Sequence, residues 1–329
     1  MEMRLACLVD ALVEPDRVHR RVYVDPEVFA LEQALNGLQF GLMLFLLAAG
    51  LTLVFGVMDM INLAHGSLYM VGAFIGAWIV GLTGSFLLGI VGAVLGTAAF
   101  GMALESSLLR SLYARDHLSQ VLATFALILI LNDGTRMLFG NDLPLSAPAA
   151  LDGPVELLPG LSYPAYRLVI IGAGLVLALS LYLLVVKTRM GALVRAGASN
   201  REMATAMGVD IKRLFTVVFG IGAGLCAVAG VLMGPLLAVQ VGMGENILIL
   251  AFVVIVIGGI GSIRGALVGA LLVGVVDTFG RTVMQALFRE FLPPQMASAA
   301  GPALASVAIY VFMAAVLAIR PQGLFPARG

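Results

Sequence analysis

Continuous apolar runs dominate the chain, and they recur at the length that a lipid bilayer requires. Examples of uncharged runs are Gly37–Met58, Gly84–Leu104 and Gly265–Val276. In hydrocarbon the backbone polar groups must be paired internally, so the crossing segments form helices or a closed barrel. Barrel strands would alternate apolar and polar positions, and these runs do not. The pattern therefore predicts an all-α fold, a polytopic membrane helix bundle.

We expect eight or nine crossings, because a membrane helix needs about 20 apolar residues. The expected spans are 38–57, 66–82, 85–104, 118–138, 168–186, 214–236, 246–263, 265–284 and 301–319. The segment 66–82 is short, and the region 246–284 is interrupted by the glycines of 258–265. Either segment could be a broken or re-entrant helix.

Both ends of the chain are more polar than its middle. Residues 1–34 mix acidic and basic side chains and lack the basic-then-apolar order of a signal peptide. We therefore divide the chain into a polar N-terminal extension over 1–34, a transmembrane domain over 35–325 and a short C-terminal tail over 326–329.

The composition narrows the functional classes. Hydrophobic residues make up 61% of the chain and charged residues 12%, where a soluble domain carries about 25% charged residues. The formal net charge is zero and no basic tract suggests nucleic acid. The 39 glycines suit close helix packing in a membrane. Cys7 lies in the polar extension and Cys226 within a span, so we do not expect them to pair.

The charges of the loops predict an orientation, because basic loops stay in the cytoplasm. The loop 187–213 holds six basic and two acidic residues, whereas 139–166 holds three acidic residues and no Lys or Arg. We expect 187–213 inside and 139–166 outside. Arg110 and Arg115 place the loop 105–117 inside, and Arg320 and Arg328 place the C-terminus inside.

The basic loop contains a candidate helix over 200–207. Ser199 precedes Glu202 by three residues, which is the spacing of a capping box, and Gly208 can end a helix in the left-handed conformation. A helix this short is unstable alone in water and must pack against something. It is either a structural interfacial helix or a coupling helix that inserts into a cytoplasmic subunit.

Several motifs in this chain resemble one family in the same order. The stretch GALVRAGASNREMATAMGV (191–209) is similar to the cytoplasmic signature of the permease subunits of branched-chain amino acid ABC transporters, the LivH type. The stretches GLTLVFGVMDMINLAHGSLYMVGA (50–73), GGIGSIRGALVGALLVG (258–274) and RPQGLF (320–325) resemble that family too. The resemblance covers about 35–325, so the N-terminal extension lies outside it.

The resemblance implies a multi-pass subunit of an ATP-driven importer in the bacterial inner membrane. Its implied cargo is branched-chain or related small amino acids, although members with very similar motifs move urea or short amides. The implied partners are two cytoplasmic ATPase subunits that hold the ATP, a second related permease subunit and a periplasmic substrate-binding protein. Within the cytoplasmic signature, the candidate coupling residues are Gly191, Arg195, Ala196, Glu202, Ala204 and Gly208.

Two polar or glycine-rich breaks are candidates for the substrate pathway. Asn62, His65 and Gly66 form a polar cluster between two spans, where interrupted helices of transporters often contact their substrates. The alternative is that Asn62 caps a helix and His65 bonds a nearby carbonyl. Gly258, Gly259 and Gly261 either permit tight helix packing or form a flexible break, with Arg264 at its cytoplasmic end.

Other chemistry finds little support in the sequence. No phosphate-binding loop and no recognisable catalytic set occurs, so we expect neither an ATPase nor another enzyme. The three histidines lack metal-ligand spacing, and we expect no cofactor in this chain. We expect Asp133 to pair with Arg136 or Asn132, Asp277 to pair with Arg281, and Glu245 to lie in an exposed loop. An ion-coupled secondary transporter, the rival class, would need more unpaired ionisable residues in the membrane.

Overall fold

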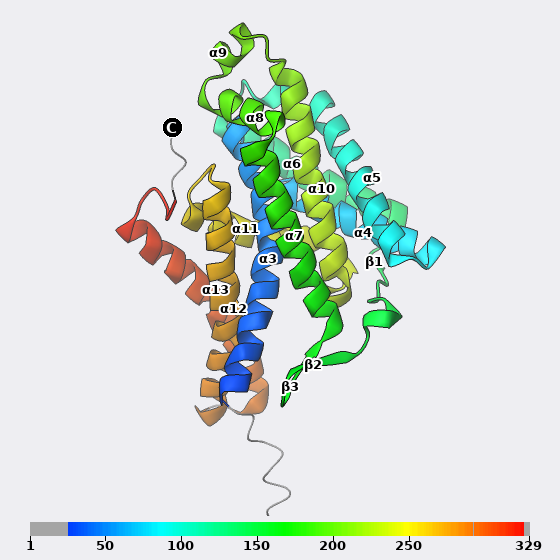
Figure 1. The fold of residues 1–329 in the computed structure, drawn as a ribbon, viewed down its shortest axis with the longest axis vertical. Coiled ribbons are helices and arrows are strands. Elements are labelled where there is room, and N and C mark those ends of the chain that lie inside the picture. The colour runs from blue at the N-terminus through cyan, green and yellow to red at the C-terminus, as the bar shows by residue number, and fades with distance from the viewer. Residues whose placement is uncertain (1–25, 292, 326–329) are drawn as a thin grey trace, which may run out of the picture.

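The computed structural model describes residues 26–291 and 293–325, and it is a bundle of long, roughly aligned helices (Figure 1). The long helices are α3 (Pro26–Met58), α4 (His65–Thr83), α5 (Phe86–Ser107), α6 (His117–Phe139), α7 (Ala165–Lys187), α10 (Ile211–Leu237), α12 (Ile263–Phe291) and α13 (Pro294–Ile319). The shorter helices are η1 (Leu109–Leu112), η2 (Ala149–Leu151), α8 (Arg189–Ser199), α9 (Arg201–Ala206) and α11 (Met243–Gly258).

Strands occur only as two small antiparallel pairs among the described residues. β1 (Asp142–Leu143) pairs with β4 (Val239–Gln240), and β2 (Pro154–Leu158) pairs with β3 (Leu161–Pro164). The first pair ties the connection after α6 to the end of α10. Both pairs lie in connections between the long helices, so the core of the bundle is mainly helical.

Two helices form the centre of the bundle. In the most apolar stretches of α3 and α10, 83% of the residues are buried, compared with 17% in α7 and 11% in α13. Glycines allow the central helices to approach their neighbours: Gly50 of α3 faces Gly222 of α10, and Gly41 faces Ala270 of α12. The outer helices present their apolar side chains outward, as expected for surfaces that face lipid.

The predicted membrane bundle is confirmed. Within 26–291 and 293–325, eight helices are long and apolar enough to cross a membrane, and α11 is shorter with 16 residues. The expected span 246–263 instead ends at Gly258, because the chain turns through 259–262 before α12 begins. Residues 26–34 of the expected polar extension belong to α3. Residues 1–25 and the tail 326–329 lie outside the described residues.

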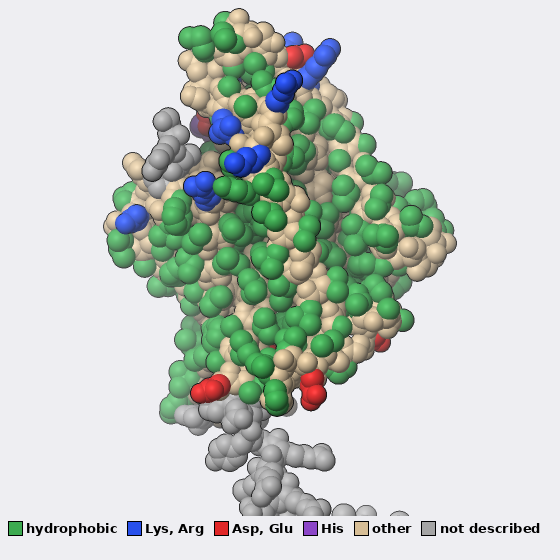
Figure 2. Space-filling view, in the orientation of Figure 1, with side chains coloured by type: hydrophobic (Ala, Val, Ile, Leu, Met, Phe, Trp, Pro, Cys, Tyr) green, Lys and Arg blue, Asp and Glu red, His purple; other side chains and the backbone are tan. Residues whose placement is uncertain are grey.

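The segments predicted to be cytoplasmic meet at one end of the bundle. Arg110 of η1 contacts Thr216 near the start of α10. Phe325, in the segment after α13, lines the same cleft as Ser199 of α8. The strand pair β2–β3 lies at the opposite end (Figure 1). In Figure 2, Lys and Arg gather at the α8–α9 end, while the acidic side chains near β2 and β3 mark the other end.

Candidate functional site

The helices α8 and α9 form an arm at the basic end of the bundle. Thr188 caps α8 by accepting the N–H of Gly191 at 3.2 Å, and Arg195 donates to the carbonyl of Val185. Gly191 packs directly on that same carbonyl, where a Cβ would collide. These contacts fold α8 back onto the end of α7. The arm is therefore built against the bundle and carries α9 outward.

The cap of α9 differs from the predicted one. Ser199 is the last residue of α8, and the extended residue Asn200 is the true N-cap, accepting the N–H of Met203 at 2.9 Å. The capping-box prediction was wrong because Asn200 is also a strong capping residue and lies one position closer to the helix. The predicted end is confirmed: Gly208 has φ +87° directly after the C-cap Met207.

The two faces of α9 differ sharply in exposure. Ala204 is 5% exposed and packs inward, whereas Met203 and Met207 are 62% and 79% exposed and lie one turn apart. Glu202 is exposed as well. The two methionines are therefore the large apolar side chains of the surface that α9 presents, and Ala204 packs beneath it. Whether Ala204 contributes to coupling stays a prediction.

Arg201 connects the arm to the central helix α3. Its Nη2 donates to the carbonyl of Val57 at 3.1 Å, and its guanidinium lies 5.3 Å from the ring centre of Phe215 on α10. Val57 is the penultimate residue of α3, immediately before the chain leaves the helix. A movement of α9 would therefore displace the end of α3 through this hydrogen bond.

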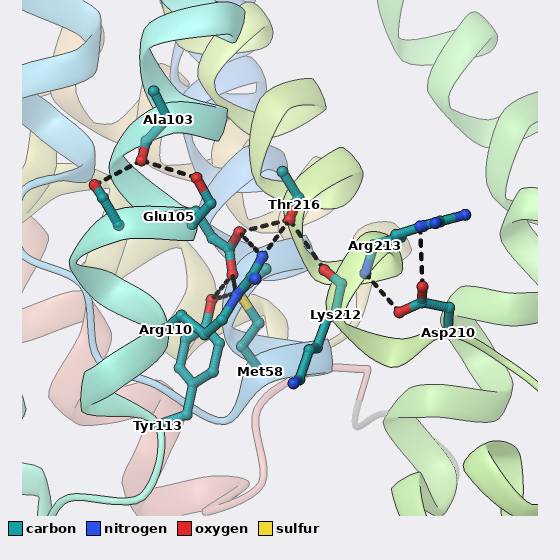
Figure 3. A network of polar contacts seen from close by, with 11 residues as sticks. Met58, Ala103, Glu105, Arg110, Tyr113, Asp210, Lys212, Arg213 and Thr216 are labelled. Carbon is teal, nitrogen blue, oxygen red and sulfur yellow. Dashed lines mark hydrogen bonds and ion pairs between the residues drawn. The ribbon is translucent and has the colours of Figure 1, made fainter.

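A buried carboxylate lies beside this connection (Figure 3). Glu105 of α5 is fully buried, and it accepts hydrogen bonds from Tyr113 at 2.8 Å, Thr216 at 2.6 Å and Arg110 at 3.0 Å. Arg110 also donates to the Thr216 hydroxyl at 2.8 Å. This network, defined here as Glu105, Arg110, Tyr113 and Thr216, joins α5, η1 and α10. A buried charge is tolerated when it is paired and hydrogen-bonded in this way.

The network favours the protonated forms of Arg110 and Tyr113. The hydrogen bond to Glu105 raises the pKa of Arg110, and burial followed by the same carboxylate raises the pKa of Tyr113. Both groups therefore remain donors to the carboxylate at physiological pH. The Tyr113 ring also packs edge-on against Phe215, the ring that Arg201 covers. The network and the arm thus share one aromatic contact.

Between α3 and α4 the chain runs without helical structure through 59–64, inside the bundle. Side chains replace the missing helical partners of its backbone: Gln120 and Thr124 of α6 accept from Ile61 and Leu63, at 3.4 and 3.3 Å. Asn62 accepts the N–H of Ala64 at 3.0 Å. The predicted interruption between the two helices is therefore present, and hydrogen bonds to side chains of α6 satisfy part of its backbone. Asn62 caps this turn and leaves the N-cap of α4 to Ala64, which has no side-chain bond.

His65 begins α4 and is fully buried between the central helices. Its Nε2 lies 3.1 Å from the thiol of Cys226 on α10. The imidazole fits because its neighbours are glycines: a Cβ at Gly50 would lie 2.9 Å from Nε2. Gly66 packs against Gly244 at the start of α11. The polar cluster therefore meets a thiol and glycine backbone, and it does not bond the carbonyl that the alternative required.

The glycine-rich segment forms a tight turn at the basic end. Gly259 and Gly261 have φ +104° and +80°, and Gly258 packs on the backbone of Gly265. The segment after α13 then closes over this turn: Leu324 and Phe325 donate backbone N–H groups to the carbonyls of Ile257 and Gly258 at 2.8 and 2.9 Å. Gly261 packs against Gly56 near the end of α3, and it lines the same cleft as Asp59, the first residue of the break before α4. The two candidate breaks therefore both lie next to the end of α3.

The membrane carboxylates form mostly local pairs, as predicted. Arg136 binds Asp133 at 3.0 Å, and Arg281 binds Asp277 at 2.8 Å. Glu245 is exposed but was misplaced by the prediction. It lies in the first turn of α11, where an acidic side chain suits the helix dipole, and it accepts from Asn132 at 2.7 Å.

Sequence reasoning missed three of the residues that organise this site. Arg201 was counted only as a loop charge, Cys226 only as an unpaired thiol, and Glu105 only as part of an interhelical loop. For Glu105 the signal was present, since it is an acidic residue at the end of an apolar run and Arg110 follows five residues later. The partner Thr216 is 111 residues away in the chain and could not be recognised locally.

A comparison with known protein families identifies the family of this chain. The family model described as the permease component of the branched-chain amino acid transport system matches residues 33–317. The chain belongs to this permease family. Its arm, its interrupted helix pair and its apolar outer helices are therefore those of a membrane-spanning transport permease.

Individual relatives agree with this membership. The permease protein BraD of Pseudomonas aeruginosa is 31% identical over 280 residues, covering 80% of this chain and 91% of BraD. The permease protein LivH of Salmonella typhimurium is 29% identical, covering 80% of this chain and 90% of LivH. Both are named as parts of high-affinity branched-chain amino acid transport systems. The more distant ribose import permease RbsC of Escherichia coli is 23% identical over 77% of this chain.

Proposed function

We propose that this permease is the membrane-spanning subunit of an importer for branched-chain or related small amino acids. In this proposal it works in the bacterial inner membrane, and ATP hydrolysis on separate subunits drives it. Its partners would be two cytoplasmic ATPase subunits, a second related permease chain and a periplasmic substrate-binding protein. Family membership supports this assignment, and the names of the relatives supply the cargo.

One structural observation carries the coupling half of the proposal. The arm exposes Met203 and Met207 at the basic end of the bundle, where apolar side chains would otherwise face water. Two methionines at i and i+4 form the kind of flexible apolar ridge that inserts into a groove of a partner. We infer that an ATPase subunit provides this groove and that the candidate coupling residues of α8 and α9 hold the ridge in place.

The contacts below the arm suggest how its movement would reach the pathway. Arg201 would transfer the movement to the end of α3, while the network around Glu105 holds α5, η1 and α10 together. The segment 59–64 follows α3 immediately and leads to His65. Asn62, His65 and Gly66 are our candidates for residues that respond at the pathway, and the turn of Gly258, Gly259 and Gly261 is the second candidate.

Copurification with the ATPase tests the docking role. Replacing both Met203 and Met207 by Glu should release the ATPase subunits and abolish uptake of radiolabelled leucine, while the chain inserts at normal levels. Leu157→Glu is the matched control, because Leu157 is an exposed apolar residue at the opposite end of the bundle. ATPase retention and full uptake in the double variant would contradict docking through α9. Competition by unlabelled urea or acetamide, rather than by valine, would contradict the proposed cargo.

The orientation can be tested separately with single cysteines. Ala149 and Ala198 are exposed and lie in the acidic and basic connections respectively. In a background without native cysteines, Ala149→Cys should react with a membrane-impermeant maleimide in spheroplasts, and Ala198→Cys should react only after lysis. The reverse pattern would invert the topology.

A further inference from the structure

A cleft of about 1040 Å³ opens at the basic end of the bundle, and the proposed function assigns no ligand to it, although Arg195 and Gly261 line it. Its walls come from the ends of α3 and α7, from α8, from the turn before α12 and from Leu324 and Phe325 after α13. It is larger than a free amino acid fills and is at the upper end of the range for drug-sized ligands. The lining holds both charged side chains and apolar ones such as Phe55 and Val186, so the cleft suits a ligand with a polar head and an apolar body.

The charged side chains of the cleft are not paired with one another. Asp59, Arg195 and Arg264 all line it, and all three are exposed. Among the described residues none of the three forms an ion pair; Arg195 bonds only the carbonyl of Val185, and Arg264 lies 5.8 Å from the ring centre of Tyr182. Two cationic groups and one anionic group thus border one space. This set offers complementary charge to a ligand that carries both an anion and an ammonium.

The backbone adds to the anionic side of this recognition. Residues 261–264, which include the N-terminal end of the 29-residue helix α12, line the cleft. The N-terminus of a helix favours anions, and phosphate is a common ligand there. Asp59 reaches the cleft from a backbone with φ +52°, which is uncommon for a residue other than glycine. Asp59 and the start of α12 therefore border the same cleft from two different segments of the chain.

The depth of the cleft indicates a lipid. Tyr182 lies five residues before the last residue of α7, so it lies about 7–8 Å below the end of that span. If α7 leaves the bilayer at its last residue, this is the depth of the boundary between headgroups and acyl chains. Val186 and Phe325 add exposed apolar surface beside it. Basic side chains surround this end of the molecule near α8 and the upper ends of α7 and α12 (Figure 2).

We propose that this cleft binds an aminophospholipid of the cytoplasmic leaflet. The phosphate lies between Arg195 and Arg264 at the start of α12, the ammonium faces Asp59, and the acyl chains leave along α7. Basic pockets between membrane helices on the cytoplasmic side are a known mode of lipid headgroup binding. Asp59 is the residue that selects a zwitterionic headgroup over a purely anionic one.

Thermal stability in the presence of added lipids tests the proposal. The purified importer in detergent should gain several degrees in Tm with phosphatidylethanolamine and less with phosphatidylglycerol. In Arg195→Gln/Arg264→Gln the apparent affinity for phosphatidylethanolamine should fall about tenfold or more, because charge-assisted hydrogen bonds are lost. Asp59→Asn should remove the preference between the two lipids. Arg115→Gln, an exposed basic residue outside the cleft, should behave as wild type.

Three results would overturn the proposal. Equal stabilisation by both lipids in wild type and Asp59→Asn would mean that no ammonium is recognised. Stabilisation by free leucine that the cleft variants lose would assign the cleft to the amino acid and not to a lipid. Loss of the ATPase or of the second permease chain from Arg264→Gln alone would mean that a protein covers the cleft, because Arg264 is not one of the candidate coupling residues. The lipid readings are made without transport, and Arg264→Gln keeps them separate from the test of the proposed function.

Discussion

Two buried polar clusters lie beside α10, and they differ in how completely their polar atoms are satisfied. In the network at the basic end, every oxygen of Glu105 has a donor within 3.0 Å. Around His65, by contrast, His65 Nδ1, Asn62 Nδ2 and the Tyr69 hydroxyl are buried without a partner in the described part of the chain. One cluster is a set of strong bonds between helices, and the other is held mainly by packing.

The difference indicates which helices move together. Relative motion of α5, η1 and α10 would break several charge-assisted bonds, so we expect these ends to move as one unit. Motion of α4 against α10 would break few hydrogen bonds, because His65 meets only the thiol of Cys226 and glycine backbone such as that of Gly222, although the two helices pack closely further along. We therefore expect relative movement at the start of α4 to break fewer polar contacts than movement at the network. The following three variants test this comparison in order of their expected effect on stability.

Glu105→Ala should produce the largest loss of stability. Removing the carboxylate leaves Arg110 and the hydroxyls of Tyr113 and Thr216 without their shared acceptor. Removal of one partner of a buried pair costs about 3–5 kcal/mol, and the partial exposure of Arg110 places the expected cost at the lower end, about 3 kcal/mol. The Tm of the purified chain in detergent measures it, with Glu202→Ala as the exposed control. A Tm equal to that of the control would contradict the idea that the network holds α5, η1 and α10 together.

Arg201→Gln should have an intermediate effect on stability and a larger one on coupling. It removes a cation–π contact and weakens one hydrogen bond to Val57, which together are worth about 1–2 kcal/mol. ATP hydrolysis by the assembled importer should continue while leucine uptake per ATP falls. Arg201→Lys should restore part of the coupling because it keeps the charge. An unchanged ratio of uptake to hydrolysis in Arg201→Gln would exclude Arg201 from transmission.

His65→Leu should cost the least stability of the three, about 1 kcal/mol or less, since it removes a weak contact with a thiol and one unpaired nitrogen. If the start of α4 is the moving contact, uptake should fall while the complex still assembles and hydrolyses ATP. Uptake and Tm measured on the same preparation separate the two effects. A strong loss of Tm with normal uptake per assembled complex would make His65 a structural residue and remove it from the pathway.

Much of the fold could be predicted because apolar length and loop charge are local properties. The helices, the break before His65 and the left-handed end at Gly208 all follow from short windows of sequence. The ends of helices were less predictable: α3 continues back to Pro26 through residues that include Glu27 and Glu32, because a helix may extend beyond the bilayer without remaining apolar.

The site could be predicted only in part, since its bonds join distant segments. The sequence marked 187–213 as a coupling region, but which face of α9 points outward depends on where α8 folds back on α7. That packing buried Ala204 and exposed Met203 and Met207. Likewise, the partner of His65 is 161 residues away, and nothing near Cys226 distinguishes it from any other small residue in a membrane helix.

The contact of Leu324 and Phe325 with the end of α11 sets the order in which this end of the bundle can form during synthesis. The last carbonyls of α11 receive their hydrogen bonds from Leu324 and Phe325, which are made only after α12 and α13. The turn at Gly259 therefore cannot reach its final form while the ribosome is still producing the last helices. Closure of this end must follow the synthesis of α12 and α13, and a chain truncated after Ile319 should insert all its helices yet leave the last carbonyls of α11 without these hydrogen bonds.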